Sequence, residues 1–299
     1  MHIRSRGVML AVATVAVAAM MAVAALAVAA LWLAPIRTAG QTPAAGLRRT
    51  ADGKPDLNGI WQSFTTANWD ILAHEAQAGP RPELMGAWGA VPGGQGIVEG
   101  NEIPYKPEAL AQKKRNFDNR MAVKVTNDPH RFDQGDPEIQ CYRAGVPRAN
   151  YMPFPFQIFQ TREQILMVYE YKGAVRTVYM DPHLEAPADS WMAWSNGRWD
   201  GDTLVIDVTA SNGHTWFDRA GNFASDNLHV VERYTPIDAS HLTYEATIED
   251  PTVFTRPWKM SFPLYRRMER NVQLVEFNCV PFVEEIMYGP IGLYKPPSK

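Results

Sequence analysis

The sequence lacks the short signatures that mark several large enzyme classes. It has no Gly-x-Ser-x-Gly elbow, no phosphate-binding glycine loop, no Gly-x-Gly-x-x-Gly fingerprint and no His-Glu-x-x-His pair. These absences argue against serine hydrolases of the common fold, nucleotide enzymes, Rossmann dehydrogenases and zincin proteases. We therefore expect that any chemistry performed by this protein needs no cofactor.

Cysteine and excess positive charge are also scarce. The 299 residues include two cysteines and no Cys-x-x-Cys, so neither a thiol redox motif nor a cysteine-rich zinc site is expected. The formal net charge is -3, which gives no indication of nucleic-acid binding. With 46% hydrophobic and 20% charged residues, the composition is that of an ordinary globular protein.

One long apolar run stands near the N-terminus. Residues 8–34 carry no charge, follow Arg4 and Arg6, and end at Pro35. A signal-peptide core usually has about 7–15 residues, and a helix needs about 20 to span a bilayer. Residues 1–40 are thus either a cleaved signal peptide or an uncleaved anchor in the inner membrane. Both interpretations place the rest of the chain in the periplasm or outside the cell.

An exported chain folds in an oxidising compartment, where an even number of cysteines favours pairing. Cys141 and Cys279 are therefore predicted to form a disulfide that closes a long loop. Such a bridge would stabilise the fold by about 3–5 kcal/mol. The alternative is a pair of buried free thiols.

The remaining chain is expected to form a linker, residues 41–54, and a single β-rich domain, residues 55–299. Within this domain, residues 62–150 are irregular and rich in turn-forming residues. They contain one predicted helix from Lys106 to Arg120, with Pro107 suited to its first turn. We interpret this segment as an insertion that wraps the core.

From Phe154 onward the hydrophobic pattern has a period of two, which is typical of strands. Turn-forming residues separate the runs, as at Trp199–Asp202. About eight strands are expected, and the fold class is mostly β: a lipocalin-like antiparallel barrel or a closed sandwich. The predicted strands are 158–160, 164–171, 175–180, 203–208, 228–234, 242–248, 258–262 and 272–279.

The chain shows two resemblances to known proteins, and the first of them supports this fold. Gly59-Ile60-Trp61 before an up-and-down β pattern resembles the Gly-x-Trp of lipocalin-type barrels, in which the tryptophan plugs one end. Over residues 50–285 the chain also resembles a family of exported bacterial proteins. The motifs that carry this second resemblance are Pro55–Trp61, Cys141–Arg148, Gly197–Val205, Glu232–Tyr234 and Asp250-Pro251.

The most polar segment of the chain, His214–Tyr234, is the main candidate for chemistry. A histidine can move a proton near neutral pH. The hypothesis assigns catalytic roles to His214, Asp218 and His229, with Asp218 orienting one of the histidines. The alternative is that these are solvated or simply hydrogen-bonded residues.

Metal binding is a third interpretation, because His214-x3-Asp218 and His229-x2-Glu232 resemble metal-ligand spacings. In a regular strand, however, His229 shares a face with Arg233, while Glu232 points to the other side. This divergence weakens a shared ion, and we predict no metal site.

Several residues are candidates for substrate binding. If the turn is Lys172-Gly173-Ala174, the hairpin register places Glu170 opposite Arg176, as a charge pair among apolar neighbours. Arg148 could bind a carboxylate or carbonyl oxygen, or it could cap loop carbonyls instead. Aromatic residues are typical of small-molecule pockets and equally of barrel cores. The remaining candidates are Tyr151, Trp194, Trp216 and Arg233.

The function expected from the sequence is an exported enzyme that uses acid/base chemistry as a lyase, isomerase or hydrolase. Its partner would be an apolar, oxygenated or aromatic small molecule, with Arg148 or Arg176 stabilising negative charge. The alternatives are a non-catalytic lipocalin-type binding protein and a structural factor of the cell envelope. We expect the pocket where the loops of residues 62–150 and 183–226 meet.

Overall fold

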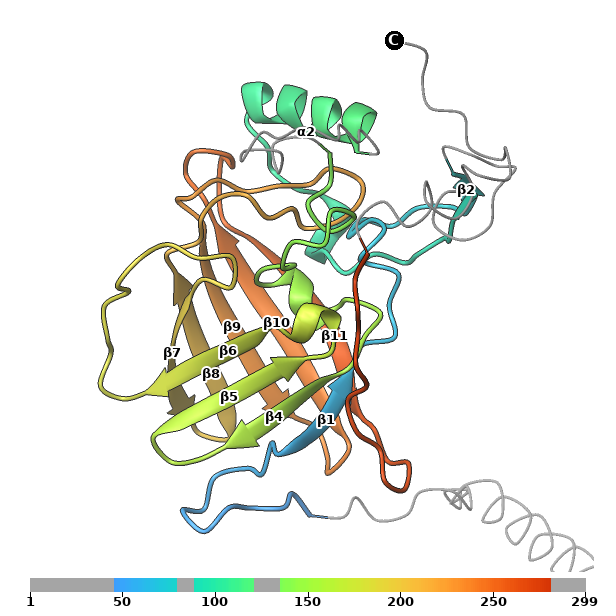
Figure 1. The fold of residues 1–299 in the computed structure, drawn as a ribbon. Helices are drawn as coiled ribbons and strands as arrows, with labels where there is room; N and C mark the ends of the chain where they lie inside the picture. The colour runs from blue at the N-terminus through green and yellow to red at the C-terminus, as the bar shows by residue number, and fades with distance from the viewer. Residues whose placement is uncertain (1–45, 80–88, 121–134, 281–299) are drawn as a thin grey trace, which may run out of the picture. The chain divides into compact units, whose positions relative to one another are not determined.

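A computed structural model describes residues 46–79, 89–120 and 135–280 (Figure 1). Nine strands in this part of the chain form a closed barrel in the order β1-β11-β10-β9-β8-β7-β6-β5-β4. The barrel strands are β1 (Gly59–Gln62), β4 (Phe156–Gln160), β5 (Gln164–Tyr169), β6 (Val175–Met180), β7 (Trp194–Asp200), β8 (Thr203–Thr209), β9 (His229–Pro236), β10 (His241–Glu249) and β11 (Trp258–Arg266).

The predicted fold class is confirmed, with three differences in detail. The barrel contains seven of the eight predicted strands and two further strands, β1 and β7. The prediction of a strand at 272–279 is wrong. That segment crosses the outside of the wall instead, since Val275 donates its N–H to the Glu170 carboxylate at 2.9 Å. The pairing is antiparallel except between β6 and β7, which run parallel.

The barrel interior follows from the alternation along each strand. In β11 the residues from Trp258 to Leu264 are alternately buried and exposed, and β10 shows the same period. Side chains of both strands therefore point inward at every second position. The fully buried interior residues include Phe156, Ile158, Ile165, Met167, Tyr234, Tyr244 and Met260.

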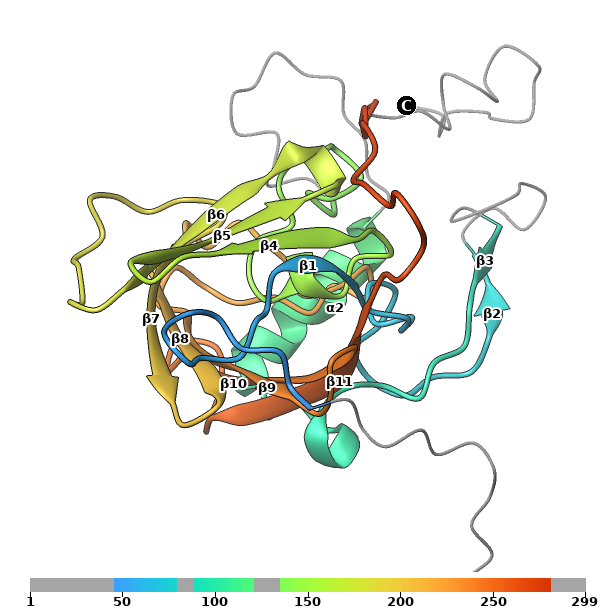
Figure 2. The same ribbon diagram turned by 90° about the horizontal axis from the view of Figure 1, so that it is seen from below.

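Trp61 closes one end of the barrel. Its side chain is fully buried, and its indole donates a hydrogen bond to the carbonyl of Leu57 at 2.9 Å. The guanidinium of Arg266 lies over the ring, 4.3 Å from its centroid. Arg266 also donates hydrogen bonds to the carbonyls of Asp56, Asn58 and Ala239. Seen along this end in Figure 2, the segment before β1 crosses beneath the barrel.

The other end is covered by α2 (Pro107–Asn119), as Figure 1 shows. This helix confirms the prediction for residues 106–120. Asn116 donates a hydrogen bond to the carbonyl of Gly221 at 3.2 Å. Gly221 has a φ of +85°, and a Cβ there would lie 2.7 Å from the backbone nitrogen of Phe117. Only glycine permits the helix to approach the loop this closely.

Between β1 and β4 the chain forms the remaining short elements. These are the hairpin of β2 (Gln77–Ala78) and β3 (Ala90–Val91), and the 3-10 turns η2 (Glu99–Asn101) and η4 (Arg148–Asn150). A further turn, η5 (Tyr171–Gly173), joins β5 to β6. Among the described residues, no helix is long and apolar enough to cross a membrane. The predicted signal or anchor within residues 1–40 lies outside the described ranges.

The predicted disulfide is confirmed. Cys141 and Cys279 are bonded, with 5.7 Å between their Cα atoms. The bridge joins the loop before η4 to the segment that follows β11, across a sequence separation of 138 residues. Phe277 packs beside it, with its ring centroid 4.5 Å from that of Phe154 and 5.2 Å from that of Tyr171. Disulfides of this kind form in oxidising compartments.

Candidate functional site

His229 lies on the outer face of the barrel wall. Its Nε2 contacts Asp207 Oδ1 at 2.7 Å, and its Nδ1 contacts Glu249 Oε2 at 3.4 Å. Burial opposes the charged ring, but the hydrogen bonds to the two carboxylates outweigh it and raise the pKa of His229. The arrangement is a surface charge cluster across three neighbouring strands, β8, β9 and β10.

Asp218 is fully buried in the loop that covers the end of the barrel. Its carboxylate accepts hydrogen bonds from the backbone nitrogens of Ile71, Ala220 and Asn222 and from the Asn222 side chain, at 2.6–3.1 Å. Burial, together with the nearby charge of Asp70, raises the pKa of Asp218 to about 7. The residue fastens this loop to the segment that follows β1, so it is not the solvated loop residue considered as an alternative.

His214 precedes this loop and is half-buried, with its ring centroid 5.9 Å from that of Trp191. Its backbone nitrogen donates to Asn212 Oδ1 at 3.2 Å. Because His229 lies on the outer wall and Asp218 is fully buried, the proposed orientation of His229 by Asp218 is not formed. The geometry therefore excludes Asp218 as the residue that orients His229, and the catalytic role of His214 stays a prediction.

The expected opposition of Glu170 and Arg176 is wrong. Arg176 lies opposite Met167, and Val168 lies opposite Val175. The turn occupies Tyr171–Gly173, with Glu170 immediately before it. The hairpin register is therefore shifted, and Arg176 points into the barrel while Glu170 lies outside.

Arg148 and Tyr151 are buried and already fully engaged. Arg148 forms a two-pronged ion pair with Asp136, at 2.8 Å for each contact, and donates from Nε to Asn68 Oδ1. Tyr151 donates its hydroxyl proton to the carbonyl of Phe217 at 2.8 Å. Both side chains hold the loops over the barrel end. The guanidinium of Arg148 binds a carboxylate of the protein itself, Asp136, rather than the loop carbonyls considered as the alternative.

Of the other candidate binding residues, Trp194 and Arg233 lie on the outside of the barrel wall. Trp194 stacks on Tyr179, with a centroid separation of 4.6 Å, and donates from Nε1 to the carbonyl of Leu184. Trp216 forms a backbone bridge with Phe223. Arg233 donates to Asp200 Oδ2 at 2.9 Å on the exposed face of β9. None of these three contacts places its side chain beside Arg176.

A polar cluster occupies the barrel interior around Arg176, a predicted binding residue, with partners that the sequence did not bring together. At its centre, Glu232 of β9 pairs with Arg176 of β6, and both side chains are buried. Glu232 Oε1 accepts hydrogen bonds from Asn150 at 2.9 Å, Tyr244 at 2.8 Å and Tyr234 at 3.3 Å. A buried charge pair is tolerated only when its remaining hydrogen-bonding capacity is satisfied, and these donors satisfy the carboxylate.

Two further groups extend this interior cluster. Arg176 donates from Nε to Ser195 Oγ at 2.8 Å, and Tyr169 donates its hydroxyl proton to Asn150 Oδ1 at 3.0 Å. Burial raises the pKa of Tyr169 to about 12, although the charge of Arg176 works against this shift. Burial likewise raises the pKa of Tyr234 and Tyr244. The tyrosines therefore stay protonated and act as hydrogen-bond donors.

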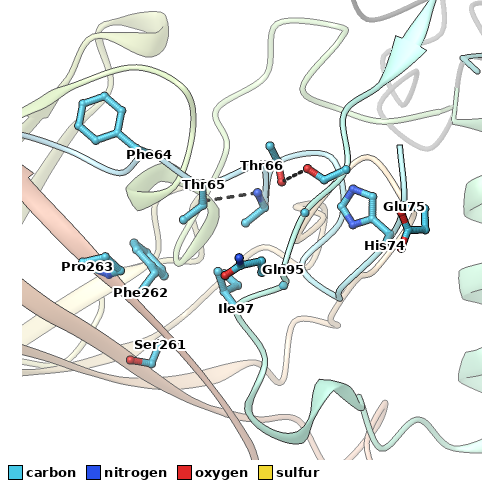
Figure 3. Close-up of a pocket in the computed structure, with 14 residues that line it drawn as sticks. Phe64, Thr65, Thr66, His74, Glu75, Gln95, Ile97, Ser261, Phe262 and Pro263 are labelled. Atoms are coloured by element: carbon cyan, nitrogen blue, oxygen red, sulfur yellow. Dashed lines mark hydrogen bonds between the residues drawn. The ribbon is translucent and has the colours of Figure 1, made fainter. Parts of the chain in front are cut away.

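A surface groove of about 620 Å³ provides the second candidate site (Figure 3). It lies between the segment that follows β1 and residues Ser261–Pro263 of β11. Figure 3 shows Phe64, Phe262 and Pro263 on one side and His74 and Glu75 on the other. The remaining lining residues are Thr65, Thr66, Ala67, Gly93, Gly94, Gln95, Gly96, Ile97 and Ser261.

The far wall of the groove is mostly backbone. His74 and Gly94 exchange two backbone hydrogen bonds of 2.9 Å. A Cβ on Gly94 would lie 2.3 Å from Thr66 Oγ1 and 2.9 Å from the His74 ring, so a larger residue here would displace both side chains. The His74 ring lies between the carbonyls of Leu72 and Pro92, each 2.8 Å from a ring nitrogen. These contacts fix the wall from which Thr66 and Gln95 reach the groove.

The groove corrects the expected location of the pocket. Residues 64–67, 74–75 and 93–97 contribute to it, as expected for the 62–150 segment. The opposite wall comes from β11, at Ser261 to Pro263, rather than from residues 183–226.

Comparisons with protein-family models, with curated proteins and with solved structures found no match for this chain.

Proposed function

We propose that this protein is a lipocalin-like binding protein that takes up an apolar, oxygenated small molecule in the groove beside β11. The observation that carries the proposal is the size and lining of the groove. Its volume of about 620 Å³ suits a small organic ligand. Its lining sets two phenylalanines, an isoleucine and a proline against hydroxyl and amide side chains, which suits a ligand with both apolar and oxygen-bearing parts.

Binding is favoured over acid/base catalysis by the positions of the candidate catalytic residues. The hypothesis of a lyase, isomerase or hydrolase needs a histidine and Asp218 beside one substrate. His229 instead lies in an outer charge cluster, and Asp218 uses both carboxylate oxygens to fasten a loop. Within the described residues, the groove is lined by neither of these side chains.

The site of action proposed for this binding protein is the periplasm or the extracellular space. The Cys141–Cys279 bridge supports an oxidising compartment. Attachment to the inner membrane through residues 8–34 belongs to the same proposal. Separating cells into soluble and membrane fractions, followed by sequencing of the mature N-terminus, tests both parts.

Native mass spectrometry of the purified protein tests ligand binding directly. Ser261 and Lys259 are both exposed on β11, but only Ser261 lines the groove. We expect a small molecule to copurify with the wild type and with K259W, and its occupancy to fall at least tenfold in S261W, where the indole fills the groove. Purification of the wild type without any ligand, or equal occupancy in the two variants, would contradict the proposal.

A further inference from the structure

The outer faces of β4, β5 and β6 form one continuous uncharged surface, which we call the apolar wall. The three strands are neighbours in the barrel and lie side by side at the front of Figure 1. Every second residue of each strand faces outward, and none of these outward residues is charged. Five of them are apolar or aromatic: Phe159, Leu166, Val168, Val175 and Tyr179. The register places Phe159 beside Leu166 and Val168 beside Val175, so the apolar side chains adjoin across the strands.

The outer faces of β8, β9 and β10 differ from this wall. There His229 contacts the carboxylates of Asp207 and Glu249, as is usual for a sheet face in water. On the apolar wall, by contrast, Phe159 and Val175 leave 46% and 52% of their surface exposed. Contiguous apolar patches on a protein surface mark sites of interaction. The apolar wall is therefore a candidate docking surface.

The charges at the two ends of the apolar wall indicate what docks there. The turn between β4 and β5 carries Arg162 and Glu163, and the turn between β5 and β6, at the other end of β5, carries Glu170 and Lys172. If a second copy packs face to face with its strands reversed, each turn lies over the other turn. Unlike charges then meet at both ends, Glu163 with Lys172 and Arg162 with Glu170. The surface is thus complementary to itself in charge.

We propose that the apolar wall binds a second copy of this protein, wall to wall, about a two-fold axis that lies in the interface across the strands. Two apolar sheet faces pack about 10 Å apart, as in a β-sandwich, and the same residues serve both copies. A charged partner surface would lose its hydration against this wall without gaining a counter-charge. The wall offers eight outward residues, fewer than the roughly 20–30 of a standard interface. The dimer is therefore weak and reversible, and it leaves the groove beside β11 free.

Sedimentation equilibrium of the protein purified after export, at concentrations from about 1 to about 200 µM, tests the proposal. We expect the average mass of the wild type to rise towards that of a dimer. V175D places a charge on the apolar wall and should raise the dissociation constant at least tenfold. T247D is the matched control, because Thr247 faces outward on β10, and it should behave as the wild type. A wild type that stays monomeric would leave the wall to another partner and overturn the proposal, as would equal weakening by V175D and T247D.

A charge swap tests the orientation of the two copies without altering the apolar residues. K172E and E163K each bring like charges together across the proposed interface and should weaken the dimer at least threefold. The double variant K172E/E163K restores unlike charges and should return the dissociation constant to within about twofold of the wild-type value. Because all of these positions are exposed, the variants retain the fold. Additive weakening in the double variant would overturn the proposed packing.

Discussion

The two faces of β9 carry charged residues in opposite environments. On the inner face, Glu232 has no exposed surface and makes a charge pair surrounded by hydroxyl donors. Three residues earlier, on the outer face, His229 bonds to Asp207 and Glu249 while 35% of its side chain stays exposed. Water screens the outer cluster, whereas the inner pair depends on its own hydrogen bonds. Similar contacts along one strand should therefore contribute very differently to stability.

The largest effect is expected from E232M, which leaves the Arg176 charge buried without its partner. Breaking a buried ion pair costs about 3–5 kcal/mol. Urea unfolding at neutral pH measures the loss. A cost below 1 kcal/mol would show that the interior is hydrated and would remove the contrast between the two faces.

The double variant R176M/E232M tests whether the loss of stability in E232M comes from the unpaired charge of Arg176. Replacing both partners of a buried pair with apolar groups of similar size is often neutral or stabilising. We expect this variant to recover most of the stability lost in E232M, as measured in the same unfolding experiment. Equal destabilisation of the single and double variants would mean that the packing of the side chains matters more than their charges.

Asp218 offers an intermediate case, because it is a buried carboxyl group that forms no ion pair within the part of the chain that the structure describes. We expect D218N to cost about 1–3 kcal/mol, since an amide nitrogen would face a backbone donor. The raised pKa of about 7 also predicts how this cost varies with pH. The folded state binds the proton more tightly than the unfolded state, so the stabilisation is complete below about pH 4 and is lost as the pH rises through 7.

The cost of D218N should therefore be greatest near pH 4 and decrease towards pH 8. Unfolding of the wild type and the variant across this range measures the difference. A cost that increases with pH would show that the four donors around Asp218 hold it ionised.

The smallest effect is expected on the outer face. H229A should cost about 0–1 kcal/mol, as for exposed ion pairs. The pKa of His229 is raised, so its contribution is complete below its unfolded pKa of about 6.5 and is lost as the pH rises through the folded value. Unfolding at pH 6 and pH 9 tests this, and a cost that is larger at pH 9 would contradict the assigned charge interactions.

The alternation in the sequence predicted which residues of β9 share a face, but not the importance of Glu232. His229 and Arg233 were separated correctly from Glu232 and Tyr234, as the burial pattern shows. The catalytic hypothesis nevertheless assigned the main role on this strand to His229, because a histidine can move a proton near neutral pH. Glu232 is the one charged residue on the otherwise apolar face of this strand. That pattern alone could have predicted that Glu232 is buried and paired with a cation.

Other features could not be predicted from local patterns. The position of Arg176 depends on the turn at Tyr171–Gly173, where Lys172 adopts a φ of +62°. No periodicity reveals that conformation. The groove combines residues 64–67, 74–75 and 93–97 with β11, and Ser195 contacts Arg176 across the parallel pair. Both arrangements depend on contacts between distant segments. The disulfide, by contrast, followed from the number of cysteines.

The parallel pairing of β6 with β7 has a consequence for the way such a barrel can change. A ring of strands can alternate in direction all the way round only if their number is even, and this ring has nine strands within the described residues. With an odd number of strands, at least one pair of neighbouring strands must therefore run parallel. The chain must return along the length of the wall between those strands, through residues 181–193. Loss or gain of a single strand would make the number of strands even and remove the need for a parallel pair. The connection through residues 181–193 could then shorten to an ordinary hairpin turn.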